Sequence, residues 1–342
     1  MSESESYDVF LAGPVFMDII FSGMPQAPVL GTETWADSMG CCPGGIANMA
    51  VALSRLGRTT SLSTSFGDDA YGDFCRESLE LSEGIDISGS VRTAGSHTPV
   101  TVSLAYEGDR TMVSHGHTNE NPNDLAVPNA KFVFVTTNAG RSIPWLERAH
   151  TAGARVFVNS GWDPTGRWDL AALADLHHAD VFVANETEAM SWTGANSPSA
   201  AAHELARYVA LAVVTRGARG AIAVDGAHDH PIDVPGMADV TAIDPTGAGD
   251  IFVAGLMTGL SLDCALRDSL SLGCVAAGLS VQRLGGSFSA PTWDEIRTWY
   301  RTHNSRGRTD FEADYGFIDG LFPENERPRK PRRALPTMGF RA

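Results

Sequence analysis

The sequence predicts an α/β fold, in which helices flank a mostly parallel sheet and a small, separate β-sheet accompanies it. From residue 131 onward, short apolar runs typical of buried strands alternate with helical patterns. Between residues 98 and 114, apolar residues instead alternate with small or polar ones, which indicates a hairpin with one solvated face. The 342 residues, 43% of them hydrophobic, suffice for one large α/β domain or two modest ones.

The first part of the chain supplies elements of both sheets. We expect strands at 8–15 and 59–66, helices at 46–56 and near 70–82, and further strands of the small sheet within 20–40. Gly57 is placed to end the first helix, because glycine readily adopts the conformation that follows a helix. Asp69 is placed to cap the second helix, because its carboxylate can accept from a free N–H group of the first turn.

The second part of the chain supplies the parallel sheet and its helices. We expect strands at 132–136, 155–159, 181–184, 211–215 and 221–224, and helices near 144–152, 169–178, 186–193, 199–209, 249–260 and 263–283, with another from about 292. The tail from 303 is rich in Gly, Pro, Arg and Asp. Its basic end, Arg327 to Arg333, is expected to be mobile or loosely docked.

Charge and composition exclude several classes of function. A net charge of -16 argues against nucleic acid as the main partner, and no apolar run is long enough to span a membrane. The five cysteines and ten histidines show no metal-ligand spacing, so we expect reduced thiols and a cytoplasmic protein. Only two lysines occur and no lysine-containing phosphate loop, so any phosphate transfer must depend on helix dipoles, a metal ion and arginine.

The segment Asp244–Asp250 (DPTGAGD) carries the strongest chemical signal. Its small residues precede an apolar helical stretch, so the pattern predicts a loop that opens directly into a helix. Backbone N–H groups and the positive end of a helix together favour a bound anion. Asp250 is then either a solvated cap of the helix or the base that removes a proton from an attacking hydroxyl.

Two further features point to a site for a small polyhydroxyl molecule. Gly44 and Gly45 precede a helix and are either a tight turn or a hinge beside bound substrate. Asn48, in the first turn of that helix, can offer one donor and one acceptor to sugar-like hydroxyls. Asp18 follows the first strand and is either a cap or a carboxylate that binds two vicinal hydroxyls.

Two segments are candidates for a nucleotide and its metal ion. Asn185 and Glu188 open a helix after a buried strand, which is ordinary helix capping or the surroundings of a Mg²⁺ ion and its waters. Thr215, Gly217 and Gly220 lie in a turn between two strands, where a hydroxyl and bare backbone can meet phosphates.

Together these residues resemble the ribokinase-like (PfkB-type) family of carbohydrate and nucleoside kinases. The first family signature is met by Gly44, Gly45, Asn48, Ala50, Gly57 and Gly67, and the second by 244–250 with Ala254 and Gly255. The two nucleotide segments lie between these signatures, in the expected order. The resemblance covers roughly residues 8–303 and implies a doubly wound α/β core with a small β-sheet lid. It divides the chain into a kinase domain at 1–303, with lid strands from about 15–40 and 98–115, and an extension at 304–342, partly mobile.

The resemblance also implies a role for each candidate residue in an ATP- and Mg²⁺-dependent phosphotransferase. Asp250 would be the catalytic base and the amides of Gly247, Ala248 and Gly249 the anion hole, while Asp18, Gly44, Gly45 and Asn48 would face the acceptor. Asn185, Thr215, Gly217, Gly220 and Gly278 would face ATP, Glu188 and Asn185 would hold Mg²⁺ through water, and Asp244 would share a K⁺ site. Because a helix dipole favours the ionised carboxylate, we expect Asp250 to be a rather weak base.

The acceptor is less well determined than the reaction. The acidic balance and scarce lysines favour an unphosphorylated sugar, because a second phosphate needs a cationic pocket for which Arg92 and Arg110 are the nearest candidates. A ribonucleoside is the alternative acceptor, since its ribose presents the same pair of hydroxyls. A non-catalytic sugar or nucleotide sensor is a rival from another class, and the lid is a candidate for homodimer contacts.

Overall fold

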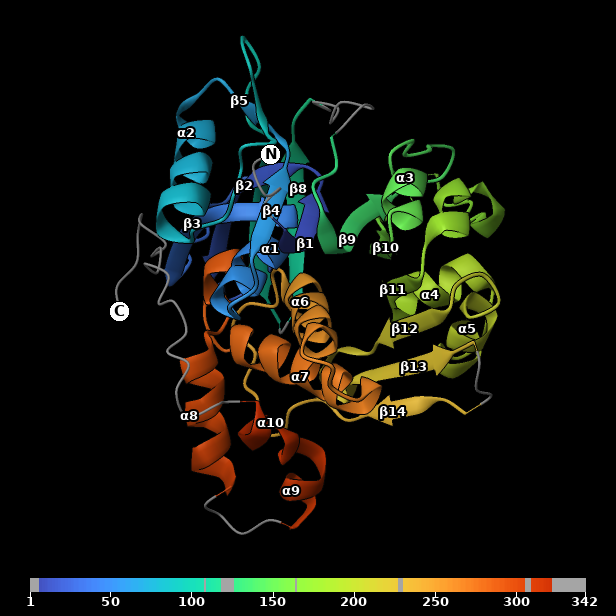
Figure 1. Cartoon of the computed structure of the whole chain (residues 1–342). Coiled ribbons are helices and arrows are strands. Elements are labelled where there is room, and N and C mark those ends of the chain that lie inside the picture. Colours follow the sequence, from blue (N-terminus) through green and yellow to red (C-terminus); the bar gives the residue numbers. More distant parts are fainter. Residues whose placement is uncertain are drawn as a thin grey trace. The chain divides into compact units, whose positions relative to one another are not determined.

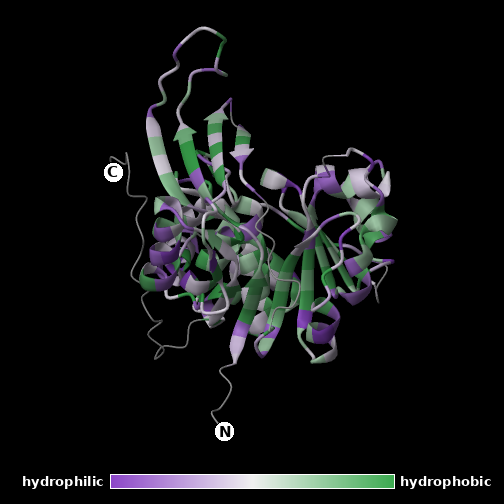
Figure 2. Cartoon of the chain, turned by 90° about the horizontal axis from the view of Figure 1, so that it is seen from above, coloured by the Kyte–Doolittle hydropathy of each residue, from purple (hydrophilic) through white to green (hydrophobic). Residues whose placement is uncertain are grey.

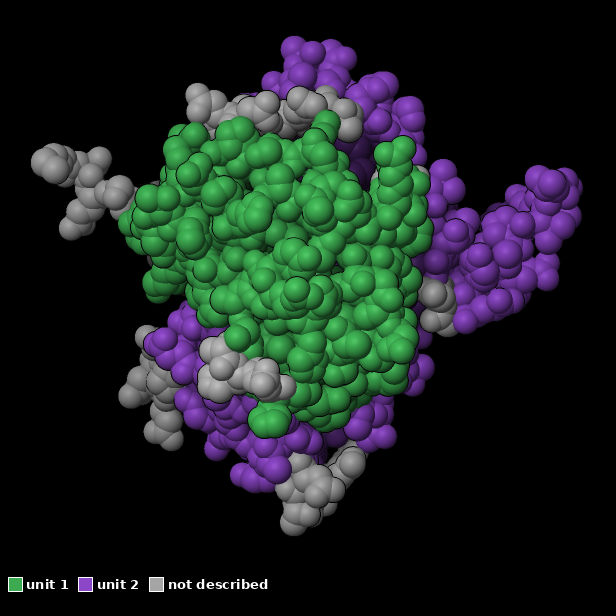
Figure 3. Space-filling model, turned by 90° about the vertical axis from the view of Figure 1, so that its right-hand side faces the viewer, with its two compact units in different colours: residues 1–13, 121–237 green, residues 14–120, 238–342 purple. Residues whose placement is uncertain are grey.

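The computed structural model describes residues 6–107, 109–117, 126–163, 165–226, 230–304 and 309–321. The chain forms two compact units, each made of two separate stretches of sequence (Figure 3). Unit 1 comprises residues 1–13 and 121–237, and unit 2 comprises residues 14–120 and 238–342. The basic run at 327–333 lies outside the described residues.

Unit 1 contains the large sheet (Figure 1). Within this unit, the strands of the sheet lie in the order β14-β13-β12-β11-β10-β9-β1, with bounds β1 (Tyr7–Ala12), β9 (Ala130–Thr137), β10 (Arg155–Ser160), β11 (Val181–Asn185), β12 (Leu211–Thr215), β13 (Ala221–Asp225) and β14 (Ile232–Val234). The pairs from β1 through β12 are parallel, and β13 and β14 are antiparallel to their neighbours. The prediction of a mostly parallel sheet is confirmed.

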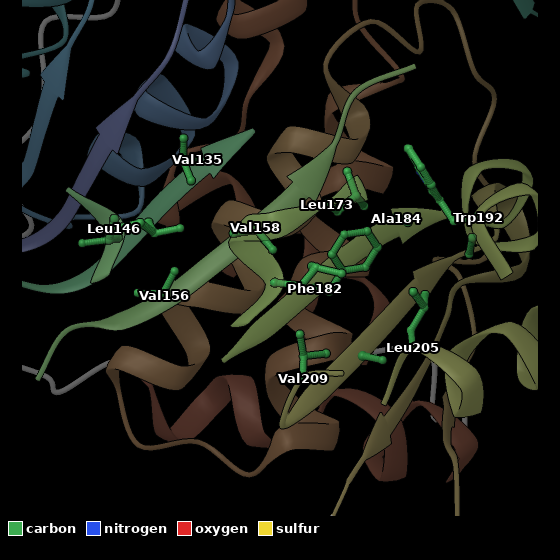
Figure 4. Packing of buried hydrophobic residues seen from close by; sticks show 14 of the residues in the cluster. Val135, Leu146, Val156, Val158, Leu173, Phe182, Ala184, Trp192, Leu205 and Val209 are labelled. Atoms are coloured by element: carbon green, nitrogen blue, oxygen red, sulfur yellow. The ribbon is translucent and has the colours of Figure 1, made fainter. Parts of the chain in front are cut away.

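The core of unit 1 explains why its strands are continuously apolar. On one face of the sheet, Val156, Val158 and Phe182 pack in a cluster with residues from the helices α3 (Leu146–Thr151), α4 (Glu186–Thr193) and α5 (Pro198–Leu205) (Figure 4). Phe157 and Val183, whose side chains point to the opposite face, are also buried. Burial on both faces removes the alternating pattern of a half-exposed strand, and the strands of the large sheet are mostly green in Figure 2.

The predicted helix at 169–178 is wrong. The chain instead forms two short 3₁₀ turns, Leu170–Ala172 and Ala174–His178. Leu173 interrupts them with a ψ of 72°. The buried Asp175 side chain accepts hydrogen bonds from Thr137 Oγ1 at 3.1 Å and Ile143 N at 2.9 Å. These bonds tie the segment to the sheet, which a regular solvent-facing helix would not do.

Unit 2 contains the separate small sheet that the hairpin pattern predicts. Its strands lie in the order β3-β2-β7-β8, with bounds β2 (Val15–Ser22), β3 (Ser38–Gly45), β7 (Val100–Tyr106) and β8 (Asp109–His115). β2 is antiparallel to β3 and parallel to β7, and β7 and β8 form the predicted hairpin. The pairing places Asp18 opposite Cys42 on one side and Thr101 on the other.

Helices supply the rest of unit 2. They are α1 (Ile46–Arg55), α2 (Ala70–Glu77), α6 (Ala248–Ser261), α7 (Leu266–Ser280), α8 (Trp293–Asn304), α9 (Thr309–Tyr315) and α10 (Phe317–Gly320), with short strands β4 (Thr60–Ser63), β5 (Ser65–Gly67) and β6 (Val91–Thr93). As predicted, the Asp69 side chain caps α2, accepting from Gly72 N at 2.7 Å. α6 and α7 approach closely, because a Cβ atom on Gly255 would lie only 2.7 Å from the Gly273 Cα.

Two groups of contacts hold separate segments of unit 2 together. The Arg55 guanidinium is fully buried and bonds to Glu83 at 2.7 Å, and it also donates to the carbonyl oxygens of Phe288 and Ala290. In the C-terminal part, Phe311 of α9 packs on Trp299 of α8 with ring centroids 5.4 Å apart.

Among the described residues, no helix has both the length and the apolar character needed to cross a bilayer.

Candidate active site

The loop before α6 is fixed by the buried Asp244 carboxylate. Its Oδ1 accepts from Thr246 N at 2.9 Å, and its Oδ2 accepts from Gly285 N at 3.1 Å and Gly286 N at 3.3 Å. One side chain therefore ties two loops together. Since both oxygens already accept backbone N–H groups, this arrangement favours a structural role for Asp244.

The glycine that starts α6 lies directly against α1. Gly247 has a φ of 77°, and a Cβ atom there would lie 2.8 Å from the Asn48 Cγ. Only glycine satisfies both the backbone conformation and the close approach. The Ala248 N–H donates to the Pro245 carbonyl oxygen at 3.2 Å, whereas the N–H groups of Gly249 and Asp250 lie in the first turn and have no intrahelical acceptor.

Asp250 stands in the first turn of α6 and meets Asn48 from the first turn of α1. The Asn48 Nδ2 donates to the Asp250 Oδ2 at 3.0 Å. Burial raises the pKa of Asp250 to about 6, although the Asn48 hydrogen bond and the Arg110 charge act to lower it. The expectation of a weak base is therefore wrong: desolvation outweighs the factors that favour the ionised form, and the pKa lies close to neutral.

Asp18 lies in the middle of β2, on the sheet face that also carries Ile20 and Cys42. Its side chain is only 5% exposed. Burial raises the pKa of Asp18 to about 7; the negative charges of Asp250 and Asp244 raise it further, and that of Arg110 lowers it. A Cβ atom on Gly44 would lie 1.9 Å from the Asp18 Oδ2, so the glycine is required for the carboxylate to fit.

The glycine pair and Asn48 shape the start of α1. Gly45 is the N-cap residue, with a φ of 62°, and because it has no side chain it supplies no acceptor to the N–H groups of the first turn. Within the described chain, the buried Oδ1 of Asn48 accepts no hydrogen bond, while its Nδ2 is used by Asp250. A buried acceptor of this kind is costly unless a ligand or water donates to it. The structure thus brings Asp18, Gly44, Gly45, Asn48 and Asp250 together in unit 2.

The two arginines considered for an acceptor phosphate differ in their surroundings. Arg92 forms ion pairs with Asp68 at 2.8 Å and Asp73 at 3.1 Å, so its charge is already compensated. Arg110 pairs with Ala105 across the hairpin, which places it on the same sheet face as Ser103. Its charge acts on Asp18 and Asp250, so it balances the two carboxylates.

The candidate nucleotide residues lie at the carboxyl ends of neighbouring strands in unit 1. Asn185 ends β11 and pairs with Thr215, which ends β12. Asn185 and Glu188 form a capping box: the Asn185 Oδ1 accepts from Glu188 N at 2.9 Å, and the Glu188 Oε2 accepts from Asn185 N at 3.2 Å. The capping interpretation of these two residues is confirmed.

The remaining predicted glycines have separate roles. Gly217 has a φ of 57° with open space where a Cβ would stand, whereas a Cβ on Gly220 would lie 2.1 Å from the Val234 carbonyl oxygen. Gly220 is therefore needed for packing against β14, and Gly217 leaves bare backbone accessible. Gly278 lies in α7 of unit 2, where its carbonyl oxygen accepts from Gln282 Nε2 at 2.9 Å.

Two features of this region were not assigned from the sequence. The Ser103 and Thr246 hydroxyls lie 3.3 Å apart, joining the small sheet to the loop before α6. The alternating pattern of β7 would place Ser103 on the solvated face, but the structure buries Thr101, Ser103 and Ala105 and leaves the apolar residues between them half-buried, so the sequence carries no signal for this contact. Cys42 packs with Ile20 and Phe288, and burial raises the pKa of its thiol well above the usual value, so it acts as a core residue.

The comparisons with known proteins agree with this arrangement. The chain is 31% identical over 288 residues to a fructokinase of Klebsiella pneumoniae, covering 75% of this chain and 91% of that protein. It is 28% identical over 312 residues to the bifunctional protein HldE of Magnetococcus marinus, covering 81% of this chain but only 61% of that longer protein. The structure of Arabidopsis thaliana ribokinase complexed with ribose and ATP superimposes with a TM-score of 0.71 at 22% identity, covering 86% of this chain and 98% of that chain. Residues 29–293 match the pfkB family carbohydrate kinases, and the chain is a member of that family.

Proposed function

We propose that the protein transfers the γ-phosphoryl group of ATP to an alcohol group of a small, unphosphorylated sugar. The observation that carries this proposal is the Asp250 carboxylate, which stands at the start of α6, is held by Asn48 and has a pKa of about 6. The membership of the chain in the pfkB family and the ribose and ATP bound to the Arabidopsis ribokinase support this proposal.

Asp250 would act as the general base towards the attacking hydroxyl. A base whose pKa lies near the working pH is mostly ionised and still basic enough to accept a proton in the transition state. The transferred phosphoryl group passes through a loose transition state, so positioning and charge stabilisation supply most of the rate. The N–H groups of Gly249 and Asp250, in the first turn of α6, are suited to receive the developing negative charge.

Asp18 and Asn48 are suited to bind the acceptor. The buried Asn48 Oδ1 lacks a donor, and a sugar hydroxyl would supply one. The ionised Asp18 carboxylate can accept hydrogen bonds from two hydroxyl groups on neighbouring carbons of the same sugar. The negative charges of Asp244 and Asp250 both act on Asp18, and the charge of Arg110 opposes them. A second phosphate on the acceptor would meet this excess of negative charge, which favours an unphosphorylated sugar.

Unit 1 carries the residues that we assign to the nucleotide. We assign the ATP phosphates to Thr215 and Gly217, because the turn after β12 offers a hydroxyl and accessible backbone. Mg²⁺ fits Asn185 and Glu188, since carboxylate and amide oxygens are the ligands that it prefers, and contact through water leaves their capping box intact. When bound, the ion would neutralise phosphate charge. For K⁺, the Asp244 carboxylate could supply at most one ligand position, because three of its about four acceptor positions are used by N–H groups.

The assignment of Asp250 is tested by Asp250→Asn, with Asp268→Asn as the matched control. Asp268 occupies the same position in the first turn of α7 that Asp250 occupies in α6. ADP formation is measured over a panel of pentoses, hexoses and ribonucleosides, and ATP binding is measured by calorimetry. We expect a sugar to support turnover, Asp250→Asn to abolish it with ATP binding retained, and the control to stay active.

Each alternative function has its own outcome in the same panel. Turnover with ribonucleosides alone would replace the sugar by a nucleoside acceptor. Tight binding of a sugar without ADP formation would identify a sensor. Near-normal turnover by Asp250→Asn would remove the base assignment.

We also propose a cytoplasmic homodimer formed through the small sheet. The cytoplasmic location is supported by the five cysteines, which are all free. A dimer is supported by β8, the outer strand of that sheet in the described chain, on which Met112 is 52% and Val113 66% exposed. Sedimentation of the wild type and of Val113→Lys tests the dimer, and a monomeric wild type at high concentration would contradict it.

A further inference from the structure

Three histidines of unit 2 converge at one end of the small sheet, and none of them belongs to the candidate active site with Asp18 and Asp250. One ring nitrogen from each of His97, His115 and His117 lies within 4.8 Å of the others. The ring centroids are 5.2 Å apart for His97 and His115 and 4.7 Å apart for His97 and His117. His97 is half-buried, and the other two are exposed.

The backbone of the hairpin produces this convergence. His115 ends β8 opposite Val100, the first residue of β7. His117 follows two residues later, and alternate residues of an extended chain point to the same side. Gly116 between them permits a close approach to the other strand, because a Cβ atom there would lie 2.6 Å from the Pro99 Cβ. The chain before β7 then brings His97 to the same place.

His97 is held in an orientation that suits a metal ligand. Its Nδ1 lies 3.3 Å from the Thr98 carbonyl oxygen, and an Nδ1–H donated there leaves Nε2 free as the ligand atom. Thr98 is fixed in turn by the Asp69 carboxylate, through its N–H at 2.8 Å and its hydroxyl at 2.7 Å. This chain of bonds resembles the carboxylate and carbonyl support that orients histidines in metal sites.

We propose that His97, His115 and His117 bind one transition-metal ion of the Zn²⁺ type. Three imidazoles with a water in the fourth position form a tetrahedral set common for this ion. Imidazole is a poor ligand for Mg²⁺, which prefers oxygen, so the site is chemically separate from the kinase reaction. The bound ion would join the segment before β7 to the segment after β8 and so close the open end of the hairpin.

The test uses purified, untagged, metal-free protein. Zn²⁺ affinity is measured by competition with a chromophoric chelator, and Co²⁺ is added separately to record its visible absorption. The variants are His97→Ala, His115→Ala and His117→Ala, with His230→Ala as the control for loss of an exposed histidine outside the cluster. Thermal unfolding without metal establishes that each variant is folded, and His117→Cys tests whether another zinc ligand restores binding.

We expect one Zn²⁺ per chain and the intense absorption of tetrahedral Co²⁺. Each cluster variant should bind Zn²⁺ at least about tenfold more weakly, while the control and His117→Cys bind like the wild type. The inference is overturned if wild-type protein binds no Zn²⁺, or if the cluster variants and the control bind it equally.

Discussion

The pH dependence of catalysis depends on one hydrogen bond, that from Asn48 to Asp250. If Asp250 is the base and its pKa is about 6, kcat measured at saturating acceptor, whose hydroxyls keep Asp18 ionised, must fall as pH decreases below 6, reaching about one tenth of its plateau at pH 5. Asn48→Leu removes the donor that stabilises the ionised carboxylate. A hydrogen bond to a charged group contributes about 1.5–3 kcal/mol, and 1.36 kcal/mol corresponds to about one pKa unit.

The acidic limb of the Asn48→Leu profile should therefore move up by about 1–2 units, to about pH 7–8. At pH 7 the variant would lose about two- to tenfold in kcat through protonation alone, and raising the pH would recover that loss. Weaker binding of the acceptor would instead raise KM and leave the acidic limb of kcat in place, so the two effects separate.

The assay is a coupled measurement of ADP formation from pH 4.5 to 9.5 at constant ionic strength. Ser54→Ala serves as the control, because Ser54 lies in the same helix but donates to the Glu83 carbonyl oxygen at 2.5 Å. Its limb should stay at about 6. An unshifted limb in Asn48→Leu, or a wild-type limb that does not reflect a group near pH 6, would refute the electrostatic role assigned to Asn48.

Three other substitutions test neighbouring parts of unit 2. Asp18→Asn should abolish activity yet stabilise the fold at pH 8. Because the pKa of Asp18 is raised in the folded state, its stabilising contribution is present in acid and lost as pH rises through about 7. Removing the charge should therefore increase the free energy of unfolding in urea by up to about 4 kcal/mol, and a decrease would contradict this. Gly44→Ala should displace Asp18 and raise the acceptor KM at least about tenfold with little change in ATP affinity, as two-substrate kinetics would reveal. Glu83→Gln should cost about 3–5 kcal/mol in urea unfolding, because it leaves the Arg55 charge buried, and a cost below about 1 kcal/mol would argue against this.

Most of the fold could be predicted from the sequence because local patterns reported it directly. The continuous apolar runs of β9, β10 and β11 and the alternation along β7 gave the two sheets. The segment at 169–178 failed because Asp175 turns inward to reach Thr137. That contact joins residues far apart in the sequence, and no local pattern shows it.

The residues of the candidate site could be predicted from the sequence, but the pKa of Asp250 could not. The sequence places Asp250 in the first turn of a helix, and from that position alone its pKa should be low. Burial reverses the direction, and burial depends on packing against other elements, such as α1 with Asn48. The histidine cluster was missed for a related reason. His115 and His117 are spaced for one face of a strand, but His97 joins them only through the register of the hairpin.

Unit 1 is made of two separate stretches of sequence, and this determines the order in which the strands of the large sheet can pair. Its first strand, β1, pairs with β9, and about 120 residues of translation separate them. At about 5–20 residues per second, a ribosome needs roughly 6–24 s to deliver the second strand. During that interval Val9, Phe10 and Leu11, which are buried in the finished protein, lack this partner and are open to capture by a chaperone or by another nascent chain.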